Sequence, residues 1–190
     1  MGAGPAGRAE LAGSAHDFSG EAWSGGDPCV VCHTPHGALQ DESEAPLWNH
    51  ELTGASFRLY ASPTLNATLE QPAGVTRLCL SCHDGTVALD SFGGRTGNEM
   101  IGAAGRLGSD LSDDHPVGFV FDDNLAQEDG GLHPPSSTPS GLGRTIAQDL
   151  LRQGRLECTS CHDVHNSSNQ PHLLVMSNRG SALCLTCHRK

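Results

Sequence analysis

Four copies of the pattern Cys-x-x-Cys-His constrain the fold of this 190-residue chain more than any other feature. The copies begin at Cys29, Cys79, Cys158 and Cys184, and we call them motifs I to IV in chain order. This pattern is the attachment signature of c-type haem, in which two thiols bind the porphyrin and the adjacent imidazole binds the iron. The motifs use all eight cysteines and therefore predict four haem c groups. The predicted attachment residues and proximal ligands are Cys29, Cys32 and His33; Cys79, Cys82 and His83; Cys158, Cys161 and His162; and Cys184, Cys187 and His188.

Other uses of paired cysteines explain this pattern less well. Zinc sites with four cysteines, and the disulfides of secreted proteins, do not require a histidine after the second cysteine. With 11 histidines in 190 residues, a histidine at all four of these positions is not expected by chance. An iron–sulfur site would need a tighter run of cysteines. A thioredoxin-like dithiol occurs beside a βαβ pattern, which this sequence lacks.

The composition predicts a polypeptide with a poor core of its own. Aromatic residues make up 4% and hydrophobic residues 36%, against 24 glycines and 11 prolines. A bare chain of this kind is typically dominated by loops, but four large apolar porphyrins can replace the missing core. We therefore expect one tetrahaem cytochrome domain over residues 1–190, mostly irregular coil with a few short helices and minimal strand, wrapped around a chain of haems. We expect it not to fold without haem.

Several segments of this domain have local predictions of their own. Residues 1–28 form an N-terminal arm, which is a possible subunit-exchange segment. Residues 117–121 predict a short strand, and residues 145–156 an amphipathic helix that leads into motif III. Residues 122–144 read as an exposed acidic loop, whose segment 134–140 resembles a linker or an O-glycosylated patch. The gaps between the motifs share no period, so the repeat is one of cofactor sites and not of structural units.

The net charge of −11 constrains the partners. The haem propionates would add to it, which argues against nucleic acid or anionic membranes and favours cationic redox partners or bound metal cations. No run of 18 apolar residues occurs, so we expect no membrane insertion. The first 15 residues are not a signal peptide. Because c-type haem is attached outside the cytoplasm, we expect an exported protein whose signal peptide is absent from this numbering.

Seven histidines lie outside the motifs and can supply the sixth iron ligand. The chain has only three methionines, so ligation of each iron by two histidines is favoured, with low reduction potentials. His36 and His165 each follow a proximal histidine by three residues and would share its face of a helical turn. Each should therefore bind an adjacent haem, unless it is merely exposed to solvent beside the motif. The remaining five are His16, His50, His115, His133 and His172.

Two of these five are predicted ligands. His115 precedes a proline that stiffens the chain. His16 stands alone before motif I and could fold back onto its own haem, reach a haem of the next subunit, or have no such role. His50 is the reserve ligand, whereas His133 and His172 are expected to be surface residues or weak metal binders.

Several distinctive sequence segments extend beyond the haem motifs. They are Ser-Ala-His-Asp-Phe-Ser (14–19), Cys-Val-Val-Cys-His-Thr-Pro-His-Gly (29–37), Ala-Pro-Leu-Trp-Asn-His (45–50), Leu-Cys-Leu-Ser-Cys-His-Asp-Gly-Thr-Val-Ala (78–88), Asp-His-Pro-Val-Gly-Phe (114–119) and Cys-Thr-Ser-Cys-His-Asp-Val-His-Asn (158–166). In this order the chain resembles the OmcE-type tetrahaem cytochromes, which polymerise into extracellular nanowires. The resemblance implies two histidine ligands on every iron, a continuous haem chain, and one distal ligand from the neighbouring subunit. Carried over, that donor is His16, with His36, His115 and His165 acting inside the subunit.

The resemblance and the motifs favour a polymeric electron conduit. Its subunits would associate head to tail at or beyond the cell surface and pass electrons to an external acceptor such as a mineral, an electrode or another cell. The alternative is a soluble periplasmic carrier. A multihaem reductase is less favoured because an enzyme needs an open iron position, whereas the spare histidines exceed the vacancies and every motif keeps its histidine. We therefore expect no catalytic residues.

Overall fold

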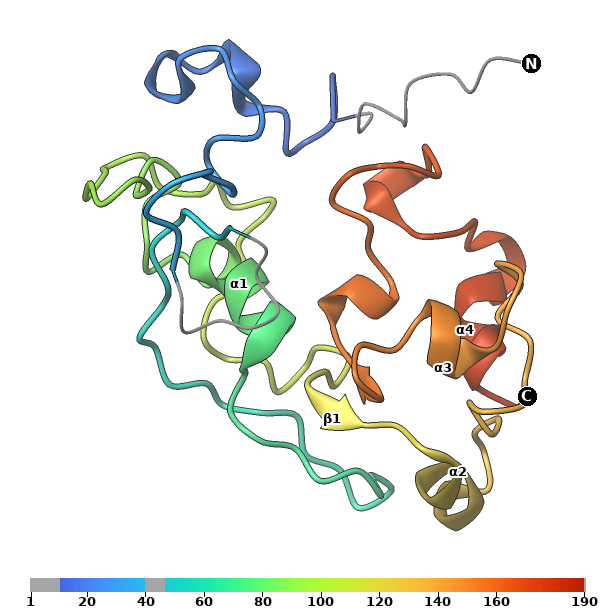
Figure 1. The fold of residues 1–190 in the computed structure, drawn as a ribbon. Coiled ribbons are helices and arrows are strands. Elements are labelled where there is room, and N and C mark those ends of the chain that lie inside the picture. Colours follow the sequence, from blue (N-terminus) through green and yellow to red (C-terminus); the bar gives the residue numbers. More distant parts are fainter. Residues whose placement is uncertain (1–10, 40–46, 190) are drawn as a thin grey trace, which may run out of the picture.

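The computed structural model describes residues 11–39 and 47–189, most of which form turns and irregular coil (Figure 1). The helices are α1 (Gly74–His83), α2 (Asp123–Asp129), α3 (Ile146–Asp149) and α4 (Ala182–Cys187). The strands are β1 (Phe119–Val120) and β2 (Arg155–Leu156), and the 3-10 turns are η1 (Phe18–Gly20), η2 (Ala22–Ser24), η3 (Cys158–Ser160), η4 (Pro171–Leu173) and η5 (Arg179–Ser181). This confirms the expected coil-rich fold with a few short helices and a minimal sheet. Within the described ranges, no helix is long and apolar enough to span a bilayer.

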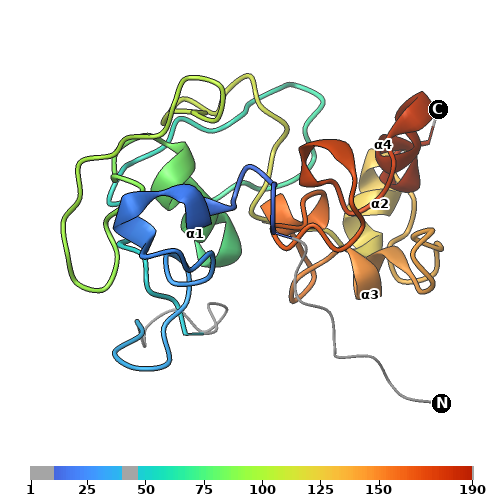
Figure 2. The same cartoon turned by 90° about the horizontal axis from the view of Figure 1, so that it is seen from above.

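The elements form two groups that lie side by side in both views (Figures 1 and 2). The blue-to-green part of the chain surrounds α1, whereas the orange-to-red part lies with α2, α3 and α4. The turn η3 belongs to the second group and packs against α1 of the first. Since α1 contains motif II and η3 begins motif III, the contact between the groups joins two of the predicted haem sites.

A glycine two residues after the end of helix α1 fixes where the helix, and with it motif II, stops. The Gly85 N–H donates to the Cys82 carbonyl at 3.1 Å, and Gly85 has a φ of 75°. A left-handed glycine just past a helix end is a common stop, because it satisfies the last carbonyls without a clash from Cβ. A Cβ at Gly85 would lie 2.6 Å from Arg106 Cδ. The last turn of α1 therefore presents Cys82 and His83 in a fixed orientation.

The predicted strand forms, and the predicted helix after it is shorter than expected. Within residues 117–121, β1 covers Phe119–Val120 and pairs antiparallel with β2, with Phe119 opposite Leu156. The helix predicted over residues 145–156 ends at Asp149, as α3. Gln153 and Gly154, with φ values of 49° and 76°, then turn the chain back into β2. The turn forms in place of a longer helix, and it brings Leu156 into the same core as Ile146 of α3 and the two leucines that follow α3, Leu150 and Leu151.

Much of the segment 122–144 is exposed, but the segment also contains a helix and several buried residues. The segment contains α2, whose N-terminus is capped because the Asp122 carboxylate accepts the Leu125 N–H at 2.8 Å. Leu125 is buried in the core, and Pro135 and Ser140 are also buried. The Ser140 hydroxyl donates to the Asp149 carboxylate of α3. Packing of Pro135 and this hydrogen bond of Ser140 hold the two ends of 134–140, whereas Ser136, Ser137 and Pro139 between them are exposed. The role of the stretch as a linker or an O-glycosylated patch stays a prediction.

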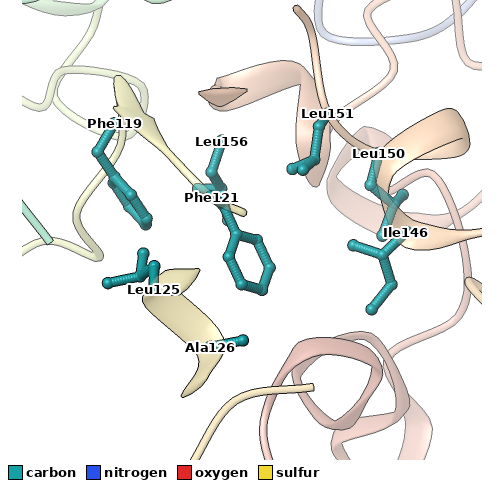
Figure 3. Packing of buried hydrophobic residues seen from close by; sticks show 8 residues of the cluster. All are labelled: Phe119, Phe121, Leu125, Ala126, Ile146, Leu150, Leu151 and Leu156. Carbon is teal, nitrogen blue, oxygen red and sulfur yellow. The ribbon is translucent and has the colours of Figure 1, made fainter. Parts of the chain in front are cut away.

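The main hydrophobic core lies in the second half of the chain (Figure 3). A second, smaller cluster contains Phe57, Leu80 and Leu111 and lies at α1, which contributes Leu80. Both clusters are small for a chain of this length, in keeping with the composition. The main core consists of Phe119, Phe121, Leu125, Ala126, Ile146, Leu150, Leu151 and Leu156.

The described part of the N-terminal arm folds back onto its own chain. The rings of Phe18 and Trp23 lie 5.3 Å apart, and the ring of Trp23 lies 6.2 Å from that of Phe92. The Ser24 hydroxyl donates to the Phe18 carbonyl at 2.6 Å. Residues 1–10 of the arm lie outside the described residues. From residue 11 onward, this packing brings the arm beside the part of the chain that follows motif II.

We expect Phe121→Ala to destabilise the haem-loaded protein by about 3–5 kcal/mol, because it leaves a cavity in the main core. Phe121 is 2% exposed, whereas the preceding Val120 of β1 is 53% exposed. The matched control Val120→Ala should stay within about 0.5 kcal/mol of the parent. Denaturant unfolding followed by far-ultraviolet circular dichroism measures both. Equal losses in the two variants would show that the cluster does not act as a core.

Candidate haem-binding sites

Each of the four motifs ends in a turn of the same kind. In motifs I, III and IV, the backbone N–H of the histidine donates to the carbonyl of the first cysteine at 2.9–3.0 Å. Motif II lies in the last turns of α1. In a helical turn, residues three or four apart lie on one face. The two thiols and the imidazole of every motif therefore come from one local turn, as covalent attachment and proximal ligation of one haem require.

The segment 45–50 provides an additional anchor for motif I. The described part of this segment, residues 47–50, pairs with the motif through a β-bridge between Trp48 and His33. The Asn49 N–H donates to the Cys32 carbonyl at 3.0 Å, and the Asn49 amide donates to the Val30 carbonyl at 2.5 Å. These bonds hold the motif I turn, which lies outside any helix.

Three motif histidines each lie opposite one histidine from outside the motifs. The ring centres of His83 and His16 are 5.9 Å apart. Those of His33 and His165 are 6.3 Å apart, and those of His188 and His115 are 6.2 Å apart. The planes of the three pairs are inclined at 61°, 19° and 80°.

These separations match two imidazoles that share one metal ion. A metal–imidazole nitrogen bond is about 2 Å long, and the ring centre lies about 1 Å behind the nitrogen, so opposed ligands have ring centres about 6 Å apart. Other aromatic pairs of the chain lie at similar distances. What distinguishes the histidine pairs is their composition, because each joins one motif histidine to one predicted distal ligand. The structure thus brings together the residues that the prediction requires for three of the four sites.

Backbone carbonyls orient three of the imidazoles. Nδ1 lies 2.6 Å from the Gly105 carbonyl in His83, 2.9 Å from the His172 carbonyl in His162, and 2.9 Å from the Pro116 carbonyl in His115. A carbonyl oxygen only accepts, so Nδ1 carries the hydrogen and Nε2 keeps its lone pair for a metal. Metal-binding histidines usually show this arrangement. The donors present therefore suit an iron at Nε2.

His16 has the environment of a neutral ligand. Burial, followed by the nearby charges of His83 and His162, lowers the pKa of His16 to about 4. Its buried Nδ1 has no hydrogen-bond partner among the described residues. A buried ring nitrogen without a partner is costly. The ring meets His83 of its own chain, so the cis alternative for His16 is the one that this structure contains; its role as a ligand in trans stays a prediction.

His36 is the one predicted distal ligand that the structure does not place opposite a motif histidine. It is exposed and lines a cavity of about 480 Å³ beside motif I, together with Asn49, Phe92 and Arg95. The guanidinium of Arg95 is suited to a carboxylate such as a haem propionate. Correspondingly, no histidine ring lies opposite His162 among the described residues.

The other three histidines are less suited to iron. His50 is 1% exposed, and its Nδ1 and Nε2 lie 2.8 and 3.0 Å from the carbonyls of Glu51 and Ala88. Both nitrogens are thus engaged, which argues against its reserve role. The backbone of His133 donates to the Cys187 carbonyl at 2.8 Å, beside motif IV. His172 is exposed, as expected of a surface residue, and its backbone carbonyl also orients His162. A backbone role of this kind leaves no signal in the residue type.

The thiols of successive motifs are neighbours. Burial raises the pKa of Cys82 to about 12, and the nearby Cys32 of motif I contributes. A hydrogen bond between the Cys79 and Cys158 thiols raises the pKa of Cys79 and lowers that of Cys158, which joins motifs II and III. Burial also raises the pKa of Cys161, with Cys184 of motif IV the next cause. The attachment points therefore form a continuous series from motif I to motif IV.

The same thiols do not build the alternative sites. The described ranges include every cysteine and histidine of the chain, and within them no three Cys, His, Asp or Glu side chains gather to hold a metal ion. None of the eight cysteines forms a disulfide in this structure. The turns that carry them fit covalent haem.

Comparison with known proteins supports the motif assignment. Residues 151–190, which contain motifs III and IV, match the family described as the doubled CXXCH motif. No match to a curated protein was found. The doubled motif indicates covalent c-type haem binding and electron transfer, as in a multihaem c-type cytochrome-like protein. When bound, the haem iron supplies reversible one-electron redox chemistry.

We expect His165→Ala to convert one haem of the loaded protein from low spin to high spin, because the iron held by His33 would lose its opposite imidazole. The matched control is His172→Asn, which keeps the carbonyl and tolerates the left-handed backbone at this position, where φ is 58°. Absorption and electron paramagnetic resonance spectra measure the spin states. An unchanged low-spin spectrum in His165→Ala would rule out the His33–His165 pairing.

Proposed function

We propose that the protein transfers electrons through four covalently bound haems, each ligated by two histidines, as a subunit of an extracellular cytochrome filament. The observation that carries the proposal is the set of three histidine pairs, each of which joins a motif histidine to a histidine from elsewhere in the chain. Two imidazoles fill both axial positions of an iron, which favours electron transfer over substrate binding. The protein is therefore a conduit and not an enzyme.

The order of the attachment points supports a conduit. Thiols of motifs I and II, II and III, and III and IV interact with one another in turn. Haems bound at these thiols would be consecutive neighbours, so that an electron passes from one to the next within the subunit. The polypeptide would set the spacing and the potentials, and the haems would supply the redox chemistry.

The fourth site gives a reason for polymerisation. His162 is exposed, and its Nδ1 is held by the His172 carbonyl, which leaves Nε2 available. The exposed His36 is the predicted distal ligand left over once the other three are paired. In the proposed filament, His36 of one subunit completes the iron held by His162 of the next. The contact joins two different surface patches, and such head-to-tail contacts form open filaments when they do not close into a ring.

The net charge suits a protein that works outside the cell. At −11 it favours solubility and attracts cationic partners. The proposed destination of the electrons is an external acceptor, with the protein at or beyond the cell surface. The competing function is a soluble periplasmic carrier, which would use the same haems in a monomer.

We expect the exported protein to carry four haems, because each motif forms an attachment turn. Intact-mass spectrometry should show the mass of the polypeptide with four haems added. Replacing both cysteines of motif III with serine should remove one haem and leave three. A parent protein with fewer than four haems would contradict the proposed stoichiometry, whatever its state of assembly.

Whether the protein forms filaments distinguishes the proposed conduit from the periplasmic carrier. We expect His36→Ala to leave four attached haems but to abolish filaments in electron micrographs, and to leave one haem high spin. His133→Ala serves as the control and should assemble as the parent does. Loss of filaments in His16→Ala with normal filaments in His36→Ala would instead make His16 the exchanged ligand. A parent protein that stays monomeric with four low-spin haems would support the periplasmic carrier.

A further inference from the structure

A buried carboxylate lies between the attachment points of motifs II and III. Glu157 directly precedes Cys158 and is 3% exposed, and Thr76, on the buried face of α1, is fully buried. The Thr76 hydroxyl donates to the Glu157 carboxylate. The Cys158 sulfur lies 3.8 Å from the same hydroxyl. The carboxylate is therefore about two hydrogen-bond lengths from a sulfur to which haem attaches.

Glu157 also shapes the turn that carries motif III. Its carboxylate accepts the backbone N–H of Ser160, and its own N–H donates to the Ser160 hydroxyl at 2.9 Å. Such a reciprocal cap satisfies backbone donors that a helical turn leaves unpaired. The side chain thus fastens the first turn of motif III and, through Thr76, fastens that turn to α1. The Cys79–Cys158 thiol contact lies at the same junction.

The charge of this carboxylate is only partly compensated. Arg155 Nε lies 3.4 Å from Glu157 Oε1, but the same guanidinium also donates to the Gly118 carbonyl and lies 3.7 Å from Glu70. One cation therefore serves two carboxylates. Because Glu157 is buried, solvent and salt screen its charge little, whereas Glu70 is 72% exposed and strongly screened.

We propose that Glu157 is the positioning and tuning residue for the haems held at motifs II and III. It fixes the spacing of the two attachment points through Thr76, and its fixed negative charge stabilises the ferric over the ferrous state of the adjacent haems. Oxidation adds a positive charge to each iron, so a nearby buried anion lowers the reduction potential. The proposal rests on the proposed haem-binding function and adds to it the residue that sets part of the potential profile.

Spectroelectrochemical titration of the haem-loaded protein tests the proposal with a matched pair of variants. Glu157→Gln removes the charge but keeps the size, and its amide can donate to the Thr76 hydroxyl, which accepts as readily as it donates. We expect one or two of the four haem potentials to shift upward. Glu70→Gln removes an equal charge from the same arginine at an exposed position and should leave the potentials unchanged. An absent shift in Glu157→Gln, or an equal shift in Glu70→Gln, would overturn the proposal.

A third variant keeps the test decisive if Glu157→Gln fails to fold. Arg155→Gln removes the partly compensating cation, so the same haems should shift downward. An upward or absent shift there would also overturn the proposal. Intact mass of every variant counts the haems. A parent protein without haems at motifs II and III would refute the haem function itself, and is distinguishable from a folded, fully loaded variant whose potentials do not move.

Discussion

Opposed pairs of histidine side chains are the interaction on which the rest of this structure depends. In each pair, one imidazole comes from a Cys-x-x-Cys-His turn and the other from a distant part of the chain. His33 and His165 come from the two different groups of elements, so an iron between them would join the groups directly. His16 similarly ties the N-terminal arm to motif II. Covalent attachment would hold a haem to one turn, and ligation by the second imidazole would make that haem a cross-link of the fold.

The small hydrophobic clusters explain why such cross-links are needed. The main core depends on Phe119, Phe121 and the side chains around them, and all its buried residues come from the second half of the chain, although Ala67 and Leu69 also pack against it. The group around α1 has the three-residue cluster that contains Leu80. Neither group buries much apolar surface, and a domain of this kind is marginal unless other bonds support it. Haems bound between the groups would bury the surfaces that the protein core leaves uncovered.

The sequence was more informative about the candidate haem-binding sites than about the fold. The motif turns follow from residue identity. The spacing of His162 and His165 predicts that the second histidine serves a different haem, and in the structure its ring lies 6.3 Å from that of His33 in motif I. The turn at Gln153 and Gly154, which shortens α3, and the burial of Pro135 were not predictable, because tertiary packing overrides local composition at both places. Glu157 and Thr76 carry no motif of their own. Their one signal is that each lies within a few residues of a haem-binding cysteine.

The positions of the histidine pairs also indicate which sites involve a single chain and which site would involve a second subunit. Three pairs close within one chain, and they involve motifs I, II and IV, so a subunit can bring its two groups together before it meets another. Only the site of motif III lacks an opposite histidine among the described residues, and motif III is also the site whose turn Glu157 fastens to α1. A turn that is held rigidly needs no second imidazole for its own placement. In the proposed filament, its remaining iron position would be completed by a neighbouring subunit, at little cost to the folding of the single chain.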